Sequence, residues 1–379
     1  MPRSSPDQKE NPDSLAGETG VQGIEALPNR VERYSKAKRQ ALDVANYMAG
    51  VPKHQAMSET VRGCGDYLVF RHYFTVDAVR LHGASLCRKH LLCPLCAIRR
   101  GAKSLAAYLQ RWEVIKVEKP RLRPFLVTLT VKDGPDLAER FRHLMKAQRE
   151  LWMRKHRGRV QSPLVGVEGA VWSYEVKRGS GSGMWHPHLH MIALAENAPD
   201  QAQLSAEWKN ITGDSHVVDV RPISEDDPVS GFIEVFKYAV KFSDQPPADT
   251  VHAWETLAGK RLLASSGCFR GVEVPKELLD DPEGFEGLPY IQLFYKFLPG
   301  GYSLSNRSEG VEPAIGPERI RRRGVAPKPW SYLDQKTRKP QKWSYTEEQF
   351  REAYQVQIKK RQVPEPMAQP CSEAVLTPH

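Results

Sequence analysis

The segment Met184–Leu194, MWHPHLHMIAL, places three histidines at alternate positions and then continues with apolar residues. Side chains alternate between the two faces of a β-strand, so His186, His188 and His190 would share one face. Three imidazoles on one face are hard to explain by packing alone, and imidazole is a common metal ligand. The pattern predicts a half-buried strand that binds a metal ion. The alternative is a strand whose histidines are ordinary hydrogen-bonded polar residues.

The preceding segment, residues 169–179, also reads as a strand, and the run GSGSG would join the two strands as a hairpin. On this first strand Glu175 falls on the face opposite to the neighbouring apolar side chains. If the register brings Glu175 near His188, it adds a carboxylate oxygen to the two imidazoles of His188 and His190. Such a set with open positions suits Mn²⁺ or Mg²⁺ better than structural zinc. A solvated carboxylate is the alternative for Glu175.

The elements around this hairpin predict the fold. The order is strand, helix, strand, strand, helix, strand and then a further helix, which is the split βαβ arrangement of a ferredoxin-like, antiparallel α+β domain. Asp136 is expected to cap the first helix, and Gly213 to close the second. The expected segments outside the hairpin are a strand at 125–131, a helix at 136–156, a helix at 202–213, a strand at 215–223 and a helix at 229–242.

Four cysteines lie in a helical, cysteine-rich segment at residues 31–110. Cys93 and Cys96 form a C-x-x-C pair, Cys87 precedes the pair by six residues, and Cys64 lies further upstream. Four thiolates suit tetrahedral zinc, and a closed shell of this kind leaves no position for chemistry, so the role would be structural. The alternative is a redox pair or unrelated buried thiols. If Cys64 lies too far away, His82 and His90 are the alternative ligands. We expect Cys268 and Cys371 to be free thiols.

The remaining segments carry fewer signals. The formal net charge of +10, from 55 Lys and Arg against 45 Asp and Glu, suits a polyanionic partner such as nucleic acid. The chain lacks an apolar run long enough for a bilayer and a secretory signal, so we expect a cytoplasmic protein without a membrane partner. Further expectations are a disordered tail at residues 1–30, an accessory subdomain with strands at 246–310, and a basic, Pro-rich, mostly disordered tail at 311–379.

The helix at residues 229–242 has two distinct faces. At 3.6 residues per turn, Glu234, Lys237, Tyr238 and Lys241 fall on one side and the large apolar residues on the other. A surface helix with simple Glu–Lys pairs is one interpretation. The functional interpretation is that a phenol, helped by a lysine and a metal-polarised electrophile, serves as a nucleophile, and that the carboxylate of Glu234 acts as a base towards water.

A histidine–apolar–histidine strand followed by a tyrosine helix on a split βαβ sheet resembles the HUH endonucleases. More closely, the chain is similar to the rolling-circle plasmid replication initiators that have a Cys-rich N-terminal segment. The matching stretches occur in order from about residue 61 to residue 244 and include CRKHLLCPLCAIRR, FLVTLTV, YEVK, HPHLHMIAL and EVFKYAVK. The resemblance implies an HUH endonuclease domain at residues 120–245, preceded by a zinc-binding segment.

The resemblance also implies residue roles. Tyr238 would be the nicking nucleophile, Glu234 would activate water in the closing step, and Lys241 would orient or neutralise phosphate. His188 and His190 would hold the catalytic Mn²⁺ or Mg²⁺, with Glu175 as third ligand and His186 as a neighbour or additional ligand.

The function implied is metal-dependent, strand-specific nicking of plasmid origin DNA at a single-stranded or hairpin site, through a 5′-phosphotyrosine. The free 3′-OH primes synthesis, and host helicase and DNA polymerase follow as partners. Alternatives are a conjugative relaxase or single-strand transposase, a non-catalytic zinc DNA-binding regulator, and a metallohydrolase of small substrates. The cysteine segment, the helix at 136–156 and the basic tail are candidates for DNA contacts.

Overall fold

The computed structural model describes Leu15, Glu18 and residues 22–157, 162–237 and 245–313. The chain divides into two units, Met1–Ala326 and Pro327–His379, and the second lies outside the described residues. None of the helices that the structure describes combines the length and the apolar composition that a bilayer span requires.

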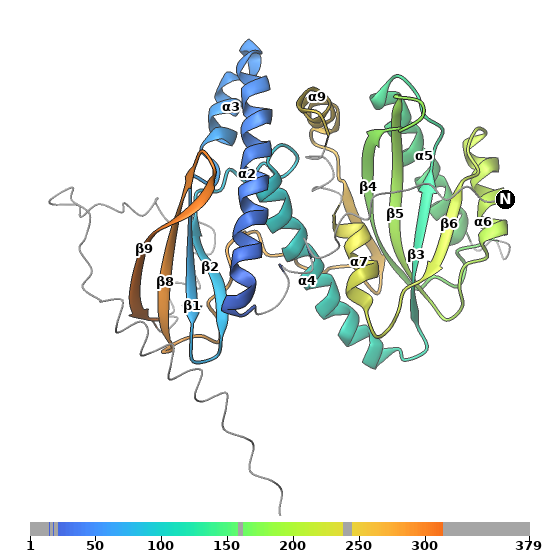
Figure 1. The fold of residues 1–379 in the computed structure, drawn as a ribbon. Coiled ribbons are helices and arrows are strands. Elements are labelled where there is room, and N and C mark those ends of the chain that lie inside the picture. The colour runs from blue at the N-terminus through green and yellow to red at the C-terminus, as the bar shows by residue number, and fades with distance from the viewer. Residues whose placement is uncertain (1–14, 16–17, 19–21, 158–161, 238–244, 314–379) are drawn as a thin grey trace, which may run out of the picture. The chain divides into compact units, whose positions relative to one another are not determined.

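A five-stranded antiparallel sheet carries the histidine strand (Figure 1). Its strands lie in the order β6-β3-β5-β4-β7, and the first four are connected by α5 between β3 and β4 and by α6 between β5 and β6. This order and these crossovers are those of a split βαβ arrangement, as the succession of elements predicts. The bounds are β3 Arg123–Thr130, α5 Leu137–His156, β4 Gly169–Arg178, β5 Trp185–Ala195, α6 Gln201–Thr212, β6 Val218–Pro222 and β7 Leu263–Gly267.

Residues next to the helices determine where α5 begins and where α6 ends. The Asp136 carboxylate accepts a hydrogen bond of 3.1 Å from the backbone N–H of Glu139, which satisfies a free donor in the first turn of α5. Gly213, with φ of 75°, ends α6 in the left-handed conformation that glycine adopts without strain. Both predicted helix boundaries are therefore confirmed.

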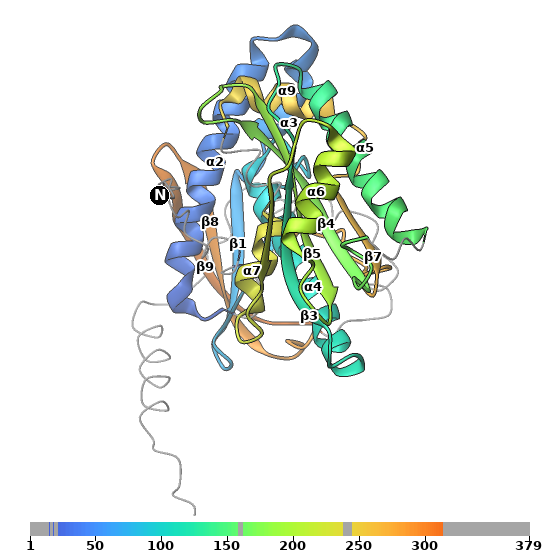
Figure 2. The same cartoon turned by 90° about the vertical axis from the view of Figure 1, so that its right-hand side faces the viewer.

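Helices cover both faces of this sheet. Figure 2 shows α5 and α6 on one side, where Leu189 and Met191 of β5 pack into the same cluster as Leu144 and Leu204. On the other side, Ile192 packs with residues of two further helices, α4 (Pro94–Glu118) and α7 (Pro228–Phe236). Because side chains alternate along β5, the predicted metal-binding histidines share the α4 and α7 side.

A second, four-stranded antiparallel sheet has the order β2-β1-β8-β9. The aromatic ring of Phe70 on β1 stacks against Tyr34 of the long helix α2, with 6.4 Å between ring centroids. The bounds of this region are η1 Ile24–Ala26, α2 Leu27–Ala49, η2 Pro52–His54, α3 Gln55–Arg62, β1 Tyr67–Tyr73, β2 Ala78–Ala84, β8 Pro289–Leu298 and β9 Gly301–Val311, and helix α9, Pro247–Leu257, lies between α7 and β7 in the chain.

The strands expected in an accessory subdomain at 246–310 belong to two different sheets. Strand β7 pairs with β4 at the edge of the five-stranded sheet, whereas β8 pairs with β1, more than 200 residues earlier in the chain. The expectation of one separate subdomain is therefore wrong. Backbone donors and acceptors of an edge strand need partners, and each segment finds them on a strand that sequence order does not indicate.

A buried ion network joins the residues before α2 to the rest of the fold. The Glu18 carboxylate lies 3.1 Å from Nη2 of Arg30 and 2.8 Å from Nη1 of Arg99, and its side chain is fully buried. Arg99 also pairs with Asp280 and donates a hydrogen bond of 2.7 Å to the carbonyl of Leu278. These contacts connect the residues around Glu18 and α2 with α4 and with residues 278–280.

This network corrects the expectation for the described part of residues 1–30. Leu15 and Glu18 are buried, and residues 22–30 include η1 and the start of α2, so these residues are not disordered. Helix α2 begins at Leu27, four residues before the start of the helical segment expected at 31–110. A charged residue such as Glu18 is uninformative in sequence, because its burial depends on arginines that come from distant segments.

Two candidate metal centres

The β4–β5 hairpin sets the position of Glu175 relative to the histidines. In this register Glu175 lies directly opposite His188, and Ser173 lies directly opposite His190. Since residues two apart share a face, Glu175, His188 and His190 all point to the α4 and α7 side of the sheet. The condition on which Glu175 was predicted to join the two imidazoles is met. We call these three residues the His–Glu group.

The His–Glu group can hold a metal ion. The Glu175 carboxylate oxygens lie 3.4 Å from Nε2 of His188 and 3.4 Å from Nε2 of His190, and the possible ligand atoms are all within 4.8 Å of one another. Two ligand atoms that each lie about 2.1 Å from one ion are separated by roughly 3 to 4 Å. Glu175 is fully buried and the two histidines are nearly so, which shields the group from bulk water.

The hydrogen bonds of the rings orient their nitrogens. Nδ1 of His188 lies 3.4 Å from the backbone carbonyl of His186, so the ring donates there and presents a lone pair at Nε2. Nδ1 of His190 lies 3.2 Å from the Thr128 hydroxyl, and Nε2 of His190 has no hydrogen-bond partner among the described residues. Burial lowers the pKa of His188 despite the nearby Glu175 carboxylate, which favours the neutral, metal-binding ring. Both residues therefore fit a divalent cation.

His186 does not belong to the His–Glu group. Its Nδ1 contacts the Asp133 carboxylate instead, and the two rings of His186 and His188 are 5.4 Å apart between centroids. Of the two roles that the resemblance leaves for His186, the geometry favours the neighbour over the additional ligand. Asp133 and Thr128 were not predicted. Each carries an ordinary oxygen, and only the pairing of β3 with β5 reveals which histidine Thr128 lies opposite.

The four cysteines of the N-terminal region come together in one group, which we call the cysteine group: Cys64, Cys87, Cys93 and Cys96. Cys64 follows α3, Cys87 follows β2, Cys93 is the N-cap of α4, and Cys96 lies in the first turn of that helix. The segment is thus folded so that the ends of three elements meet at one point. His82 and His90, the fallback ligands, are not part of the group.

The geometry of the cysteine group fits zinc. Sulfur–sulfur distances are 3.6 Å for Cys64–Cys96, 3.6 Å for Cys87–Cys96 and 3.4 Å for Cys93–Cys64. Tetrahedral zinc with Zn–S bonds of about 2.3 Å separates its sulfurs by about 3.8 Å, whereas a disulfide requires about 2.05 Å. The four described thiols are free of disulfide bonds, as is Cys268, while Cys371 lies outside the described residues.

The thiols interact strongly with one another. Hydrogen bonding with the other three cysteines, reinforced by burial, raises the pKa of Cys93, while hydrogen bonds from the same group lower the pKa of Cys87. A divalent cation would remove this conflict, because it binds all four sulfurs as thiolates.

Two residues shape the backbone around Cys64. A Cβ atom on Gly65 would lie 2.6 Å from Leu95 and 2.6 Å from the Tyr302 hydroxyl, and the φ of Gly65 is +71°. The position therefore requires glycine on grounds of both space and conformation. The space and the conformation at residue 65 explain why glycine directly follows the first cysteine. The buried Lys38 ammonium donates a hydrogen bond of 2.7 Å to the carbonyl of Cys64 and so holds the same stretch of backbone.

Helix α7 packs its apolar face on the sheet side that bears the His–Glu group. Phe232 and Phe236 are fully buried, while Glu234 is partly exposed and pairs with Lys237 at 2.5 Å. The predicted division of faces is confirmed as far as Lys237. Helix α7 ends at Phe236, with Lys237 as its C-cap, so it stops short of the end predicted at residue 242. Tyr238 and Lys241 lie outside the described residues.

The chain is fixed on both sides of residues 238–244. Before them, Phe236 belongs to the apolar cluster that includes Val171 of β4 and Ile192 of β5. After them, the Gln245 side-chain amide donates a hydrogen bond of 2.9 Å to the carbonyl of Val176, the neighbour of Glu175 on β4. Gln245 was not singled out in the sequence, because nothing near it in the chain indicates a contact with β4.

Comparison with known proteins adds independent information. The replication protein family (Rep_1) matches residues 78–287, more than half of the 379 residues. A protein named Protein rep from Lactiplantibacillus plantarum is 26% identical over 281 residues, covering 67% of this chain and 85% of that protein. A second Protein rep, from Streptococcus pneumoniae, is 27% identical over 259 residues, covering 64% of this chain and 78% of that protein.

No solved structure matches the chain. The family match includes three residues of the cysteine group, the whole five-stranded sheet and α7. The chain belongs to the replication protein family.

Proposed function

We propose that this chain is a rolling-circle plasmid replication initiator that nicks one strand of origin DNA by the chemistry of HUH endonucleases. The ferredoxin-like strand order, the cysteine group and membership of the replication protein family support this proposal. The observation that carries it is the His–Glu group on the sheet face where α7 packs, because Tyr238 follows the end of α7 by two residues in the sequence.

The proposed reaction is a transfer of the phosphoryl group from DNA to tyrosine. The Tyr238 oxygen attacks the scissile phosphorus, a Tyr–O–P bond forms, and the P–O bond to the 3′ oxygen breaks. The phenol proton is lost to solvent or a neighbouring base, and the departing 3′ oxygen takes up a proton. The product is a 5′-phosphotyrosine and a free 3′-OH, so no external energy source is required and rejoining stays possible.

Each chain residue has a defined task in this proposal. His188, His190 and Glu175 would hold Mn²⁺ or Mg²⁺, which would supply charge stabilisation at the phosphate oxygens. The buried sheet face excludes bulk water from these side chains. Lys241 would neutralise a phosphate charge.

Glu234 is proposed to act at termination. It would accept a proton from water that attacks the phosphotyrosine, which releases the enzyme without a second tyrosine. In the structure Glu234 is partly exposed and paired with Lys237, so its carboxylate is open to solvent water.

Plasmid origin DNA is the proposed partner, with a single-stranded or hairpin nick site. Host helicase and DNA polymerase would act on the nicked product. The cysteine group is proposed to bind zinc in a structural role, within the helical and cysteine-rich domain at residues 31–110.

The decisive experiment uses the full chain, Mn²⁺ and supercoiled plasmid with its origin. Wild type should form an open circle and a covalent adduct on a denaturing gel, with the phosphate on the peptide bearing Tyr238 by mass spectrometry. Tyr238→Phe should form no adduct, while the control Tyr47→Phe, at an exposed tyrosine of α2, should behave like wild type. A Tyr238→Phe variant that still forms adducts contradicts the assignment. Origin binding without any nicking by wild type would favour a zinc DNA-binding regulator.

A further inference from the structure

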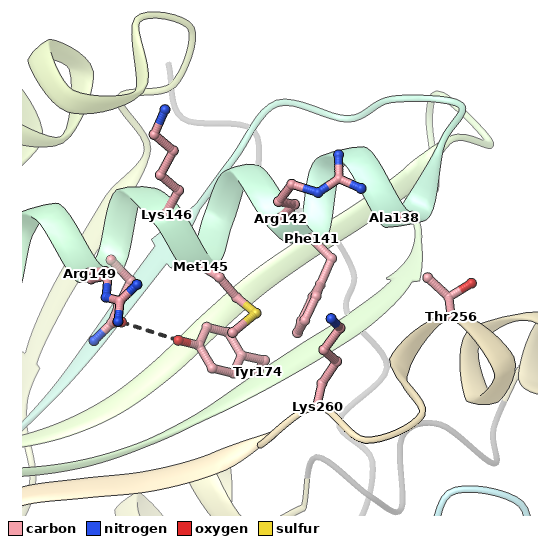
Figure 3. A pocket seen from close by; sticks show the side chains of 10 residues that line it. Ala138, Phe141, Arg142, Met145, Lys146, Arg149, Tyr174, Thr256 and Lys260 are labelled. Carbon is pink, nitrogen blue, oxygen red and sulfur yellow. Dashed lines mark hydrogen bonds between the residues drawn. The ribbon is translucent and has the colours of Figure 1, made fainter.

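A basic groove of about 700 Å³ lies on the sheet face opposite to the His–Glu group. Its walls are α5 and the chain at the end of α9, and Tyr174 of β4 lies at its base (Figure 3). Tyr174 and Glu175 are consecutive on β4, so they point to opposite faces of the same sheet. The groove is therefore a separate feature from the candidate catalytic centre.

The charge of the groove has one sign. Arg142, Lys146 and Arg149 on α5 and Lys260 after α9 line it, and none of the described residues that line it is acidic. All four are exposed, and none forms an ion pair with another described residue. Four unpaired cations around one hollow repel one another, and an anionic ligand would relieve this repulsion.

Two arginines of α5 that lie outside the groove are paired with carboxylates. Arg140 pairs with Asp214 at 2.9 Å, and Arg154 pairs with Glu150 at 2.9 Å and with Glu207 at 2.7 Å. On α5, the two arginines outside the groove are neutralised by carboxylates of the protein. The cations along the groove face solvent without such a partner among the described residues. The contrast indicates that the groove charge serves an external ligand.

The base of the groove is apolar and aromatic. Phe141, Met145 and Tyr174 line it, and the Tyr174 hydroxyl donates to the Gln148 side chain at 3.2 Å (Figure 3). The volume falls within the range of about 300–1,000 Å³ typical of small-ligand sites, large enough for an unpaired nucleobase. A basic rim over aromatic side chains is the combination that binds single-stranded nucleic acid.

The spacing of the rim fits a DNA strand. Arg142 and Arg149 are seven residues apart, about 10 Å along the axis of α5. One DNA strand advances by about 3.4 Å per nucleotide in a duplex, so the stripe spans roughly three phosphates. Duplex DNA keeps its bases stacked and cannot place one in the groove, whereas a single strand can.

We propose that this groove binds single-stranded DNA, with phosphates at the basic rim and an unpaired base against Phe141 and Met145. The inference rests on the proposed function for the source of the strand, since nicking and displacement generate it. Because the groove and the His–Glu group occupy opposite sheet faces, the strand held here is a segment other than the scissile phosphate. The groove would retain one strand while the other face acts on its own substrate.

The test measures binding of a labelled 12-nucleotide oligo-dT by fluorescence anisotropy, using the full chain without added Mn²⁺. All variants carry Tyr238→Phe, so that no covalent adduct contributes. Arg149→Gln with Lys260→Gln should weaken binding at least about 10-fold and lower the slope of log K against log salt by about 1.4. The control Lys36→Gln with Lys209→Gln removes the same charge from two other exposed positions and should change binding less than about 2-fold. Equal losses in both pairs, or no loss in the groove pair, overturn the proposal.

A second variant tests the hollow itself. Thr256→Trp narrows the groove without a change of charge and should weaken oligo-dT binding while it leaves a 12-base-pair duplex unaffected. Weakening of duplex and single strand alike overturns the assignment to single-stranded DNA. The failures of the two proposals are distinguishable, because oligo-dT binding requires neither Tyr238 nor Mn²⁺. A wild type that forms no adduct but binds oligo-dT through the groove contradicts the nickase and leaves the groove standing.

Discussion

The cysteine group and the His–Glu group both gather metal-binding side chains in buried surroundings, but they are built differently. The cysteine group takes its ligands from the ends of α3, β2 and α4, which otherwise have little reason to meet. The His–Glu group takes its ligands from two strands that are already hydrogen-bonded along their length. An ion in the first group would organise the backbone, whereas an ion in the second would bind to a backbone that is already organised.

The ligand sets of the two groups also indicate different roles. Four thiolates complete a tetrahedron and leave no position for a substrate, while two imidazoles and one carboxylate leave positions open. A site on rigid strands also holds its ligands more precisely than a site on loops. The comparison therefore predicts an ion that supports folding in the first group and an ion that supports chemistry in the second. Each of the following substitutions should break or sharpen that distinction.

The largest effect is expected from Cys93→Ser. Loss of one thiolate should reduce bound zinc from one equivalent per chain to near zero, and the free energy of unfolding should fall by several kcal/mol, since structural zinc contributes about 10 kcal/mol or more to small domains. Metal analysis by mass spectrometry and thermal unfolding by circular dichroism measure both quantities. Cys268→Ser, a thiol outside the cysteine group, is the matched control and should change neither. Unchanged zinc content in Cys93→Ser would refute the structural assignment.

Asp280→Asn tests whether the thiolates alone stabilise this region. Burial by itself would raise the pKa of Asp280, but Arg99 and Arg30 more than offset this and hold the pKa well below its usual range. Arg99 lies one turn after Cys96 on α4, so the ion network is a second constraint on the helix that carries two cysteines. Removing the carboxylate should cost about 3 kcal/mol in the free energy of unfolding at pH 7, because a buried guanidinium loses a partner.

The pH dependence of this variant has a definite sign. A carboxyl group whose folded-state pKa is depressed stabilises the fold fully above its unfolded pKa of about 3.9 and progressively less below it. The difference in free energy of unfolding between wild type and Asp280→Asn should therefore shrink as the pH falls from about 5 towards 3. Urea unfolding at several pH values measures it. A difference that stays constant over this range would mean that Asp280 does not titrate as a depressed carboxyl group.

His190→Ala should lower nicking without lowering zinc content or thermal stability, which is the reverse of the effect expected from Cys93→Ser. Nicking should fall about 10²- to 10³-fold, as for loss of a group that stabilises transition-state charge, while zinc content and thermal stability stay close to wild type. A plasmid nicking assay, a Mn²⁺ titration by calorimetry and a zinc measurement on the same preparation separate the two ions. His186→Ala is the control on the same strand face, and its loss should be below about 10-fold. If the two variants lose activity equally, the boundary of the His–Glu group is wrong.

The smallest effect is expected from Thr128→Val. The substitution keeps the shape of the side chain and removes the hydroxyl that contacts Nδ1 of His190. Loss of such a supporting hydrogen bond typically lowers metal affinity about 10- to 100-fold. The Mn²⁺ dissociation constant from calorimetry measures the change. Thr130→Val, whose hydroxyl donates to the carbonyl of Val217 rather than to a histidine, is the control and should leave the affinity within about 2-fold.

The sequence predicts the elements of the five-stranded sheet better than their neighbours. Alternation along β5 identifies the shared face of His188 and His190, and the hairpin turn makes Glu175 a candidate, because these relations are local. Asp136 and Gly213 also mark helix ends correctly, because capping depends on residues close together in the sequence. The described geometry agrees with these placements, while the roles of the site residues, Tyr238 and Lys241 included, stay predictions.

The pairing of strands in the four-stranded sheet cannot be predicted from the sequence. Strand β1 pairs with β8 through residues such as Val69 and Phe294, which are separated by most of the chain, and no local pattern encodes such a pairing. Burial of Arg99 was missed for a related reason. In the sequence it belongs to a basic run after the cysteines, and its partners Glu18 and Asp280 are both distant.

The pairing of β1 with β8 has a consequence for synthesis on the ribosome. A ribosome adds about 5–20 residues per second, so β8 emerges roughly 10 to 40 seconds after β1. During that interval the β1–β2 hairpin exposes a long edge that a neighbouring nascent chain could pair with. Zinc bound by the cysteines, which are complete by residue 96, would hold the two ends of this hairpin during the interval, since Cys64 precedes β1 and Cys87 follows β2.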